Sequence, residues 1–206
     1  MAERRHGEKA PATTSTVSGA DWYGQDVSGQ THEKVLFVDL DLTEVENTGA
    51  VFTECTFRGT TFNVSTHRDA AFVNCTFAGC TFYNTSFTEC KFLGSRFDRC
   101  TYDVMKVEGG NWSFVGMGGA DLRNASFRGV RMREADLAAV RCQGAVLRDC
   151  DLGGAWLNVA DLTGCDLRGS DLSSIDPENV KLRGAIITID QTITIAEALG
   201  LDVRAE

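Results

Sequence analysis

Long apolar segments are absent from this chain, and their absence excludes whole classes of protein. No stretch approaches the roughly 18 uninterrupted apolar residues that a membrane-spanning helix needs. Residues 1–19 lack the apolar stretch of a secretory signal, and their polar composition predicts a disordered tail. We therefore expect a cytoplasmic protein with no membrane partner.

A surplus of positive charge is lacking as well. The chain has 20 Lys and Arg residues against 29 Asp and Glu residues, which gives a net charge of −9 at pH 7. Contacts to phosphate groups need Lys and Arg side chains. This balance therefore argues against nucleic acid as a direct partner.

The sequence patterns of zinc sites and phosphate-binding loops are also missing. The eight cysteines form no Cys-x-x-Cys pair, and the histidines do not have the spacing of zinc ligands. The glycines between Gly109 and Gly119 are not followed by the Lys-Ser/Thr of a phosphate-binding loop, so we expect them to permit close stacking or a slight bend. We expect no catalytic residue, no metal and no cofactor, and hence no enzyme.

What the chain does have is a large apolar residue at every fifth position. Of the 25 positions in this register from Phe52 to Leu172, 24 hold Phe, Leu, Tyr, Trp, Met, Val or Cys. A period of five fits neither the helical period of about 3.6 nor the strand period of about two. A fixed short period is typical of a solenoid, in which each unit buries its apolar face by stacking on its neighbours.

A second register, two residues before the first, holds small residues from Ala50 to Ser170, with Met105 as the exception. One large and one small inward residue in every five predict a short straight segment that ends in a corner. Free cysteine packs as a small hydrophobe. We therefore predict a structural role for the seven cysteines of the small register and the one of the large register, which are Cys55, Cys75, Cys80, Cys90, Cys100, Cys150, Cys165 and, in the large register, Cys142.

His67 is the one exception among the 25 positions of the large register from Phe52 to Leu172. A catalytic role would require a nucleophile and an orienting acid nearby. The positions directly above and below it in a solenoid with 20-residue coils are Asn47 and Phe87, which supply neither. We therefore predict a buried or half-buried histidine whose hydrogen bonds are satisfied.

Three five-residue units carry a resemblance to a known family. They are ADLRN at residues 120–124, ADLTG at 160–164 and CDLRG at 165–169. They resemble the units of the pentapeptide-repeat family. The resemblance implies an all-β solenoid, a right-handed quadrilateral β-helix over residues 20–189, in which four units make one square coil. The phase is unbroken from Phe37 to Ile187, so we expect no inserted loop and a rod of about 37 Å.

The C-terminal segment, residues 190–206, has a different composition. Asp190 is a candidate N-cap for a helix from about Gln191 to Leu199, ended by Gly200. The helix could cap the open end of the solenoid or pack against a second copy, and we favour a homodimer because two-fold pairing closes the exposed end. The predicted dimer interface consists of Ile187, Ile189, Ile193, Ile195, Ala196, Leu199 and Leu201.

Acidic residues gather towards the C-terminal end of the predicted rod. Residues 149–178 hold seven carboxylates against the single base Arg168. They would form an acidic surface near the dimer axis, made of Asp149, Asp151, Asp161, Asp166, Asp171, Asp176 and Glu178.

Further segments, FTECTF at residues 52–57 and FVNCTF at 72–77, are similar to the fluoroquinolone-resistance members of the same family. This resemblance implies a dimeric rod that mimics duplex DNA. Such a rod would bind the DNA-binding saddle of the DNA gyrase A subunit through the acidic surface, compete with DNA and alter quinolone action. Two alternatives stay open: an interaction scaffold with another partner, and an immunity protein that guards gyrase against a toxin of its own producer.

Overall fold

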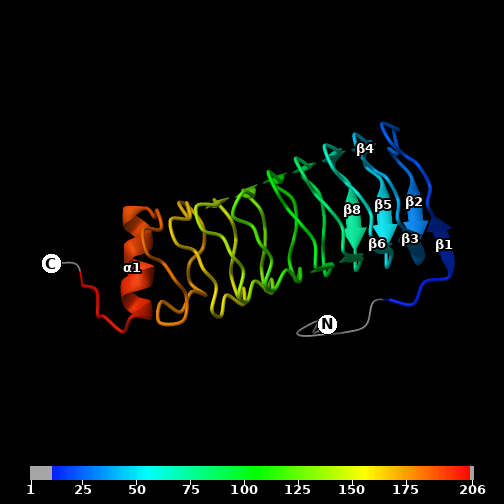
Figure 1. The fold of residues 1–206 in the computed structure, drawn as a ribbon. Coiled ribbons are helices and arrows are strands. Elements are labelled where there is room, and N and C mark those ends of the chain that lie inside the picture. The colour runs from blue at the N-terminus through cyan, green and yellow to red at the C-terminus, as the bar shows by residue number, and fades with distance from the viewer. Residues whose placement is uncertain (1–10, 205–206) are drawn as a thin grey trace.

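The computed structural model describes residues 11–204 as a parallel β-solenoid followed by one helix (Figure 1). Every pairing between coils joins residues that are 20 apart, from Ser15 with Val35 to Asp166 with Ile186. The predicted coil of 20 residues is therefore confirmed, and no loop interrupts its phase.

The coil has four faces, which we name by what lies on them. On three faces the short strands form parallel sheets, and on the fourth, the bridge face, single bridges run from Asp21 through Asp41 towards Lys181. The β1 face contains β1 (Ser15–Ser18), β3 (Val35–Val38), β6 (Thr56–Arg58), β9 (Thr76–Ala78) and β11 (Arg96–Asp98). The β4 face contains β4 (Glu46–Thr48), β7 (Thr66–Arg68), β10 (Ser86–Thr88), β12 (Lys106–Glu108), β13 (Ser126–Arg128) and β14 (Val146–Arg148). The β2 face contains β2 (Thr31–Glu33), β5 (Val51–Thr53) and β8 (Ala71–Val73).

The solenoid begins earlier than the sequence analysis predicts. β1 pairs with β3 in register, and Val17 lies opposite Phe37. The prediction of a disordered tail is therefore wrong for residues 15–18, because Val17 already occupies the large register, 20 residues before Phe37. The part of that prediction that concerns residues 1–10 lies outside the described residues.

The two registers fill the interior as predicted. Large residues stack directly between coils, as in Phe57 on Phe77, whose ring centroids are 5.0 Å apart and nearly parallel. Small residues with a thiol or hydroxyl donate to a backbone carbonyl one coil earlier: Ser95 Oγ lies 2.7 Å from the Phe72 oxygen, and Cys90 Sγ lies 3.4 Å from the His67 oxygen. This bond explains why Cys, Ser and Thr suit the small register. The cysteines are all free, and only Cys100 is less than fully buried.

His67 is fully buried and its hydrogen bonds are satisfied, as predicted. Asn47 donates to Nδ1 over 3.0 Å, and Nε2 lies 2.9 Å from Ser65 Oγ, which in turn donates to the Phe62 carbonyl. This chain of bonds requires the neutral ring with its proton on Nε2. Burial lowers the pKa of His67 to about 3.

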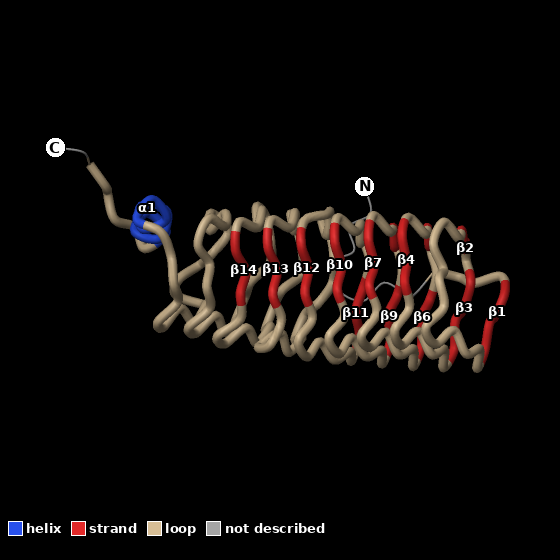
Figure 2. Tube along the Cα trace, turned by 90° about the horizontal axis from the view of Figure 1, so that it is seen from above, coloured by secondary structure: helices blue, strands red, loops and turns tan. Residues whose placement is uncertain are grey.

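The helix α1 (Ile189–Ala198) begins before the predicted start. Its N-cap is Thr188 rather than Asp190, because Thr188 and Gln191 form a reciprocal capping box, with Gln191 Oε1 accepting from the Thr188 backbone over 2.7 Å. Gly200, at φ +79, follows its end as expected. Figure 2 shows α1 end-on beyond β14, so the helix lies across the end of the rod.

Candidate protein-interaction surfaces

The C-terminal end of the coil is partly closed by α1. The side-chain amide of Gln191 donates to the carbonyls of Leu167 and Ser170, at 2.8 and 2.7 Å, and so satisfies two acceptors that the missing next coil would have met. Ile195 and Ile187 both pack against the core. The helix therefore acts as a cap, one of the two roles that the sequence left open.

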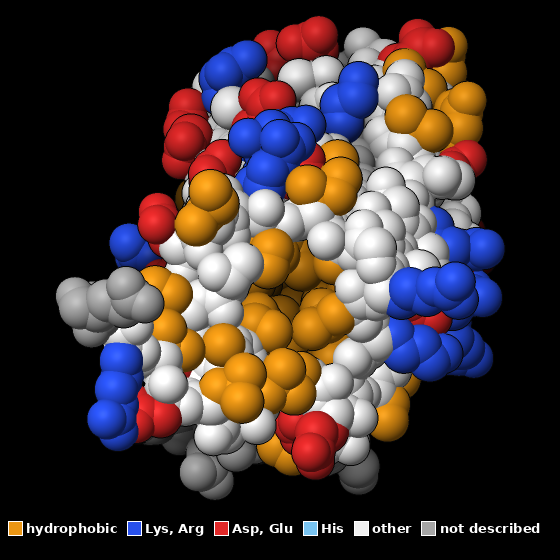
Figure 3. Space-filling model, turned by 90° about the vertical axis from the view of Figure 1, so that its left-hand side faces the viewer, with side chains coloured by type: hydrophobic (Ala, Val, Ile, Leu, Met, Phe, Trp, Pro, Cys, Tyr) orange, Lys and Arg blue, Asp and Glu red, His pale blue; other side chains and the backbone are white. Residues whose placement is uncertain are grey.

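The outer side of this cap is apolar. Ile189 is 86% exposed and Ile193 is 47% exposed. Figure 3 views the molecule from this end and shows hydrophobic side chains gathered around a hollow. We call this the apolar end; its exposed members are Ile186, Ile189, Ile193, Leu199, Leu201 and Val203.

The structure divides the predicted dimer-interface residues into two groups. Ile187, Ile195 and Ala196 are half-buried against this chain's own end, whereas the other four belong to the apolar end. Ile186 and Val203 are exposed there as well and were not predicted. Ile186 directly follows Ala185, which points inward, so Ile186 points outward. The five-residue register therefore predicts that Ile186 is exposed.

The seven carboxylates of the predicted acidic surface lie on all four faces of the rod. Asp151 and Asp171 lie on the β2 face, Asp161 on the bridge face and Asp166 on the β4 face. Asp149 lies in the turn after β14, at the corner between the β4 and β2 faces. Asp176 and Glu178 lie where the β1 face continues towards the C-terminus. The seven carboxylates form a belt around the rod rather than one patch.

Three of these carboxylates have cationic partners. Asp166 accepts from Arg168 at 2.7 Å, and this interaction lowers the Asp166 pKa to about 2. Asp151 lies 3.2 Å from Arg133. Asp161, whose pKa is lowered to about 2 chiefly by its hydrogen bond to Thr163, also lies 3.2 Å from Lys181.

The other four carboxylates form no ion pair with any of residues 11–204. Asp176 and Glu178 are exposed at a turn next to the C-terminal end, where the Asp176 carboxylate accepts from the Glu178 backbone over 3.0 Å. Hydrogen bonds from the side chain and the backbone of Ser173 lower the pKa of Asp171, and the charge of Arg133 lowers it further. The unneutralised charge therefore lies mainly in the last coil.

The first coils carry unpaired negative charge too. Asp21 bridges Asp41, and Asp26 bridges Glu46, so that like charges are neighbours between coils. None of the four has a cationic partner in the described part of the chain, 11–204. Free acidity is therefore found at both ends of the rod.

Functional residues that sequence reasoning missed include Gln191. The N3 position of a capping box is visible in the sequence as Thr188 followed three residues later by Gln191. Its second role, in capping the coil, depends on how the helix lies across the coil and has no sequence signal. No helix in the described region has the length and apolarity needed to cross a bilayer.

Comparison with known protein families gave two matches. A model described as "Pentapeptide repeats (8 copies)" matches residues 117–154 and 160–188, and a model described as "SV2A/B/C luminal domain" matches residues 22–102. A comparison with curated protein sequences found no match.

Solved structures share the fold. Full-length QnrB1, described as a plasmid-mediated fluoroquinolone resistance protein, aligns with a TM-score of 0.65 and 17% identity, over 92% of this chain and 99% of QnrB1. A trypsin-treated form of QnrB1 aligns with a TM-score of 0.59 and 20% identity, over 94% and 99% of the two chains. At these identities the likeness establishes the architecture.

Proposed function

Because the chain is a pentapeptide-repeat protein, we propose that it is a homodimeric rod that binds DNA gyrase in place of duplex DNA and so alters the action of fluoroquinolones. The observation that supports this most is the end-to-end alignment of the rod with a fluoroquinolone-resistance protein. The uninterrupted coil adds to it, because a straight rod without projecting loops fits a saddle that accepts duplex DNA.

The apolar end supports the dimer. A monomer in water would leave Ile189 and Ile193 exposed beside other apolar side chains. Pairing two such ends about a two-fold axis buries the same patch on both copies. The resulting rod would have twice the length of one chain and a belt of carboxylates on each side of the axis.

The negative charge of the rod supports an interaction with a basic saddle. The contact we propose involves only part of the belt of carboxylates. Asp171, Asp176 and Glu178 are the carboxylates nearest the apolar end that form no ion pair with residues 11–204, so we propose the principal contact there. Two copies together carry −18, twice −9. Duplex DNA carries about one charge per 1.7 Å of its length, so binding should weaken with salt less steeply than DNA binding does.

A supercoiling assay with purified gyrase tests the proposal. Titration with the protein should inhibit supercoiling at micromolar dimer and reduce DNA cleavage in the presence of a fluoroquinolone. Absence of both effects would overturn the proposal and would leave the interaction scaffold as the better interpretation.

Two variants distinguish the loss of the dimer from a general effect on folding. Ile193→Asp should give monomers by light scattering and should inhibit poorly, because half of the rod is lost. Val64→Asp is the matched control: it places the same charge at an exposed valine on the body of the rod, 41% exposed and far from the apolar end. An Ile193→Asp monomer that inhibits as well as the parent would exclude the dimer mechanism.

A second pair of variants tests the position of the contact. Asp176→Asn with Glu178→Lys removes negative charge in the last coil, and the asparagine oxygen can keep the turn hydrogen bond. Asp41→Asn with Glu44→Lys makes the same change in charge in the second coil, where Asp41 accepts from the Thr43 backbone over 2.9 Å. We expect the first pair to weaken inhibition by about tenfold or more, through repulsion at a basic saddle, and the second to weaken it less. Equal losses would argue against a contact centred on the dimer axis.

A further inference from the structure

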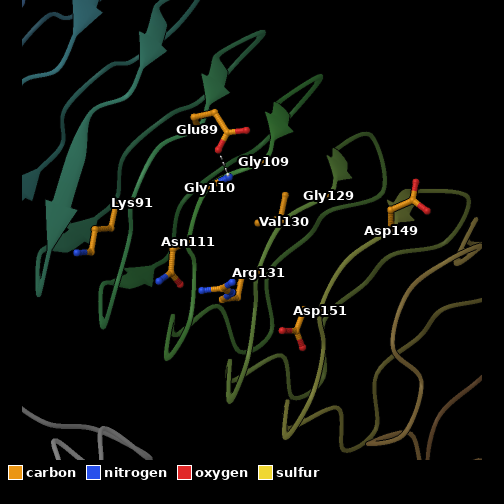
Figure 4. Close-up of a pocket in the computed structure, with 10 residues that line it drawn as sticks. All are labelled: Glu89, Lys91, Gly109, Gly110, Asn111, Gly129, Val130, Arg131, Asp149 and Asp151. Atoms are coloured by element: carbon orange, nitrogen blue, oxygen red, sulfur yellow. Dashed lines mark hydrogen bonds between the residues drawn. The ribbon is translucent and has the colours of Figure 1, made fainter.

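A groove opens at the corner between the β4 face and the β2 face, midway along the rod. Its volume is about 650 Å³, in the range of pockets that hold small ligands or short segments. Figure 4 shows two rows of side chains, with Gly109, Gly110, Gly129 and Val130 between them. The first row contains Lys91, Asn111, Arg131 and Asp151, and the second contains Glu89 and Asp149.

The first row presents free donors. Lys91 bridges Asn111, and Asn111 bridges Arg131, so the three side chains emerge from consecutive coils about 4.8 Å apart. Asn111 Oδ1 accepts from the Ser113 backbone over 3.0 Å, which leaves its amino group as a donor. The Lys91 and Arg131 side chains have neither an ion pair nor a hydrogen bond to any of residues 11–204.

The carboxylate at the end of the same row does not neutralise these cations. Asp151 accepts from Arg133, at 3.2 and 3.4 Å, and from the Gly153 backbone. Its charge is therefore directed to Arg133. The row accordingly offers two cations and an amide donor to whatever enters the groove.

The second row is acidic. Glu89 accepts from the Gly110 backbone over 3.0 Å, and Asp149 is exposed, with no cationic partner in the described residues. The two rows thus have opposite charge. A simple anion such as phosphate would be attracted by one row and repelled by the other.

The floor of the groove lacks side chains for a structural reason. Gly110 has φ +84, and a Cβ there would lie 2.1 Å from the Cys90 carbonyl oxygen, so no other residue fits. Its place belongs to the small register, and the adjacent large position holds Trp112, which is fully buried with its ring centroid 4.1 Å from that of Phe92. With glycine at this position, no side chain stands over this part of the floor.

We propose that this groove binds an extended segment of a partner protein whose acidic residues point to one side and whose basic residues point to the other. An extended strand has this property when acidic and basic residues alternate, because successive side chains point to opposite faces. Acidic side chains would meet Lys91, Asn111 and Arg131, and basic side chains would meet Glu89 and Asp149. Binding at this groove does not depend on gyrase, because the groove lies on this chain and the test uses only this protein and synthetic peptides.

The test uses three fluorescent octapeptides in low salt, with binding followed by fluorescence anisotropy. The first alternates Glu and Lys, the second has the same composition in two blocks, and the third contains only Glu. We expect saturable binding of the alternating peptide, with affinity about tenfold higher than for the others, because only it matches both rows. No saturation at millimolar protein, or equal affinity for the alternating and block peptides, would overturn the proposal.

Variants show whether the groove is the site. Lys91→Gln with Arg131→Gln should weaken binding of the alternating peptide by about tenfold or more. The matched control is Lys106→Gln with Arg128→Gln, two exposed cations of the β4 face outside the groove. Thermal unfolding followed by circular dichroism verifies folding, and Lys91→Glu alone provides the test if the double variant is unstable. An equal loss in the control, or displacement of the peptide by millimolar inorganic phosphate, would contradict a peptide groove.

Discussion

Acid should destabilise this protein through a single buried histidine. His67 is neutral in the folded chain, its pKa lowered to about 3 by burial, whereas an unfolded chain has a histidine pKa of about 6.5. Between these two values the unfolded state binds the extra proton. The stabilising contribution is therefore present above about pH 6.5 and is lost as the pH falls.

The size of the loss follows from the difference between the two pKa values. At pH 5 the unfolded histidine is almost fully protonated and the folded one is not, which costs about 2 kcal/mol of unfolding free energy; at pH 4 the cost is about 3 kcal/mol. The value at pH 5 hardly changes as long as the folded pKa lies well below 5. The low pKa of His67 comes from burial, and the hydrogen bonds to Asn47 and Ser65 hold the ring in its neutral form.

Urea unfolding at pH 7, 6, 5 and 4 measures this effect, with His67→Gln as the control. Glutamine can accept from Asn47 and donate to Ser65 without titrating, so the variant should lose the His67 part of the acid dependence. It should also be less stable at pH 7 by about 1 kcal/mol, because the stacking of His67 on Phe87, at 4.9 Å, is lost. Parallel pH profiles for the two proteins would refute the reasoning.

Two further predictions concern the core and the cap. Phe82→Ala should cost about 3–5 kcal/mol in urea unfolding, because Phe82 is fully buried and stacks on Phe62 at 4.9 Å, whereas Cys80→Ala should cost less than about 1 kcal/mol. An unchanged midpoint for Phe82→Ala would contradict the stacked core. Gln191→Leu should lower stability by about 1–3 kcal/mol and speed hydrogen exchange in α1, because two end carbonyls lose their donor. Unaltered exchange in α1 would show that the amide of Gln191 does not hold the helix.

The sequence predicts most of the fold because each coil repeats one simple requirement. A large residue every fifth position and a small one two places earlier leave a single arrangement in which both are buried. The limits of the rod are harder to predict, since one residue such as Val17 does not stand out as a periodic signal. Asp190 by itself predicts a start of α1 at Gln191, two residues too late, whereas Thr188 and Gln191 together cap the helix.

The arrangement of charge could not be found by reading along the chain, and the geometry of the coil explains why. Residues five apart lie on successive faces, so Asp161, Asp166, Asp171 and Asp176 point in four different directions although they are evenly spaced in the sequence. Apart from contacts within one turn or across one corner, side chains on the same face become neighbours at a separation of about 20, as Lys91, Asn111 and Arg131 do. In a solenoid of this kind a run of like charges therefore makes a belt, and a local site must be assembled from residues a full coil apart. For the same reason an ion pair such as Lys181 with Asp161 joins residues that a linear count of charges treats as independent.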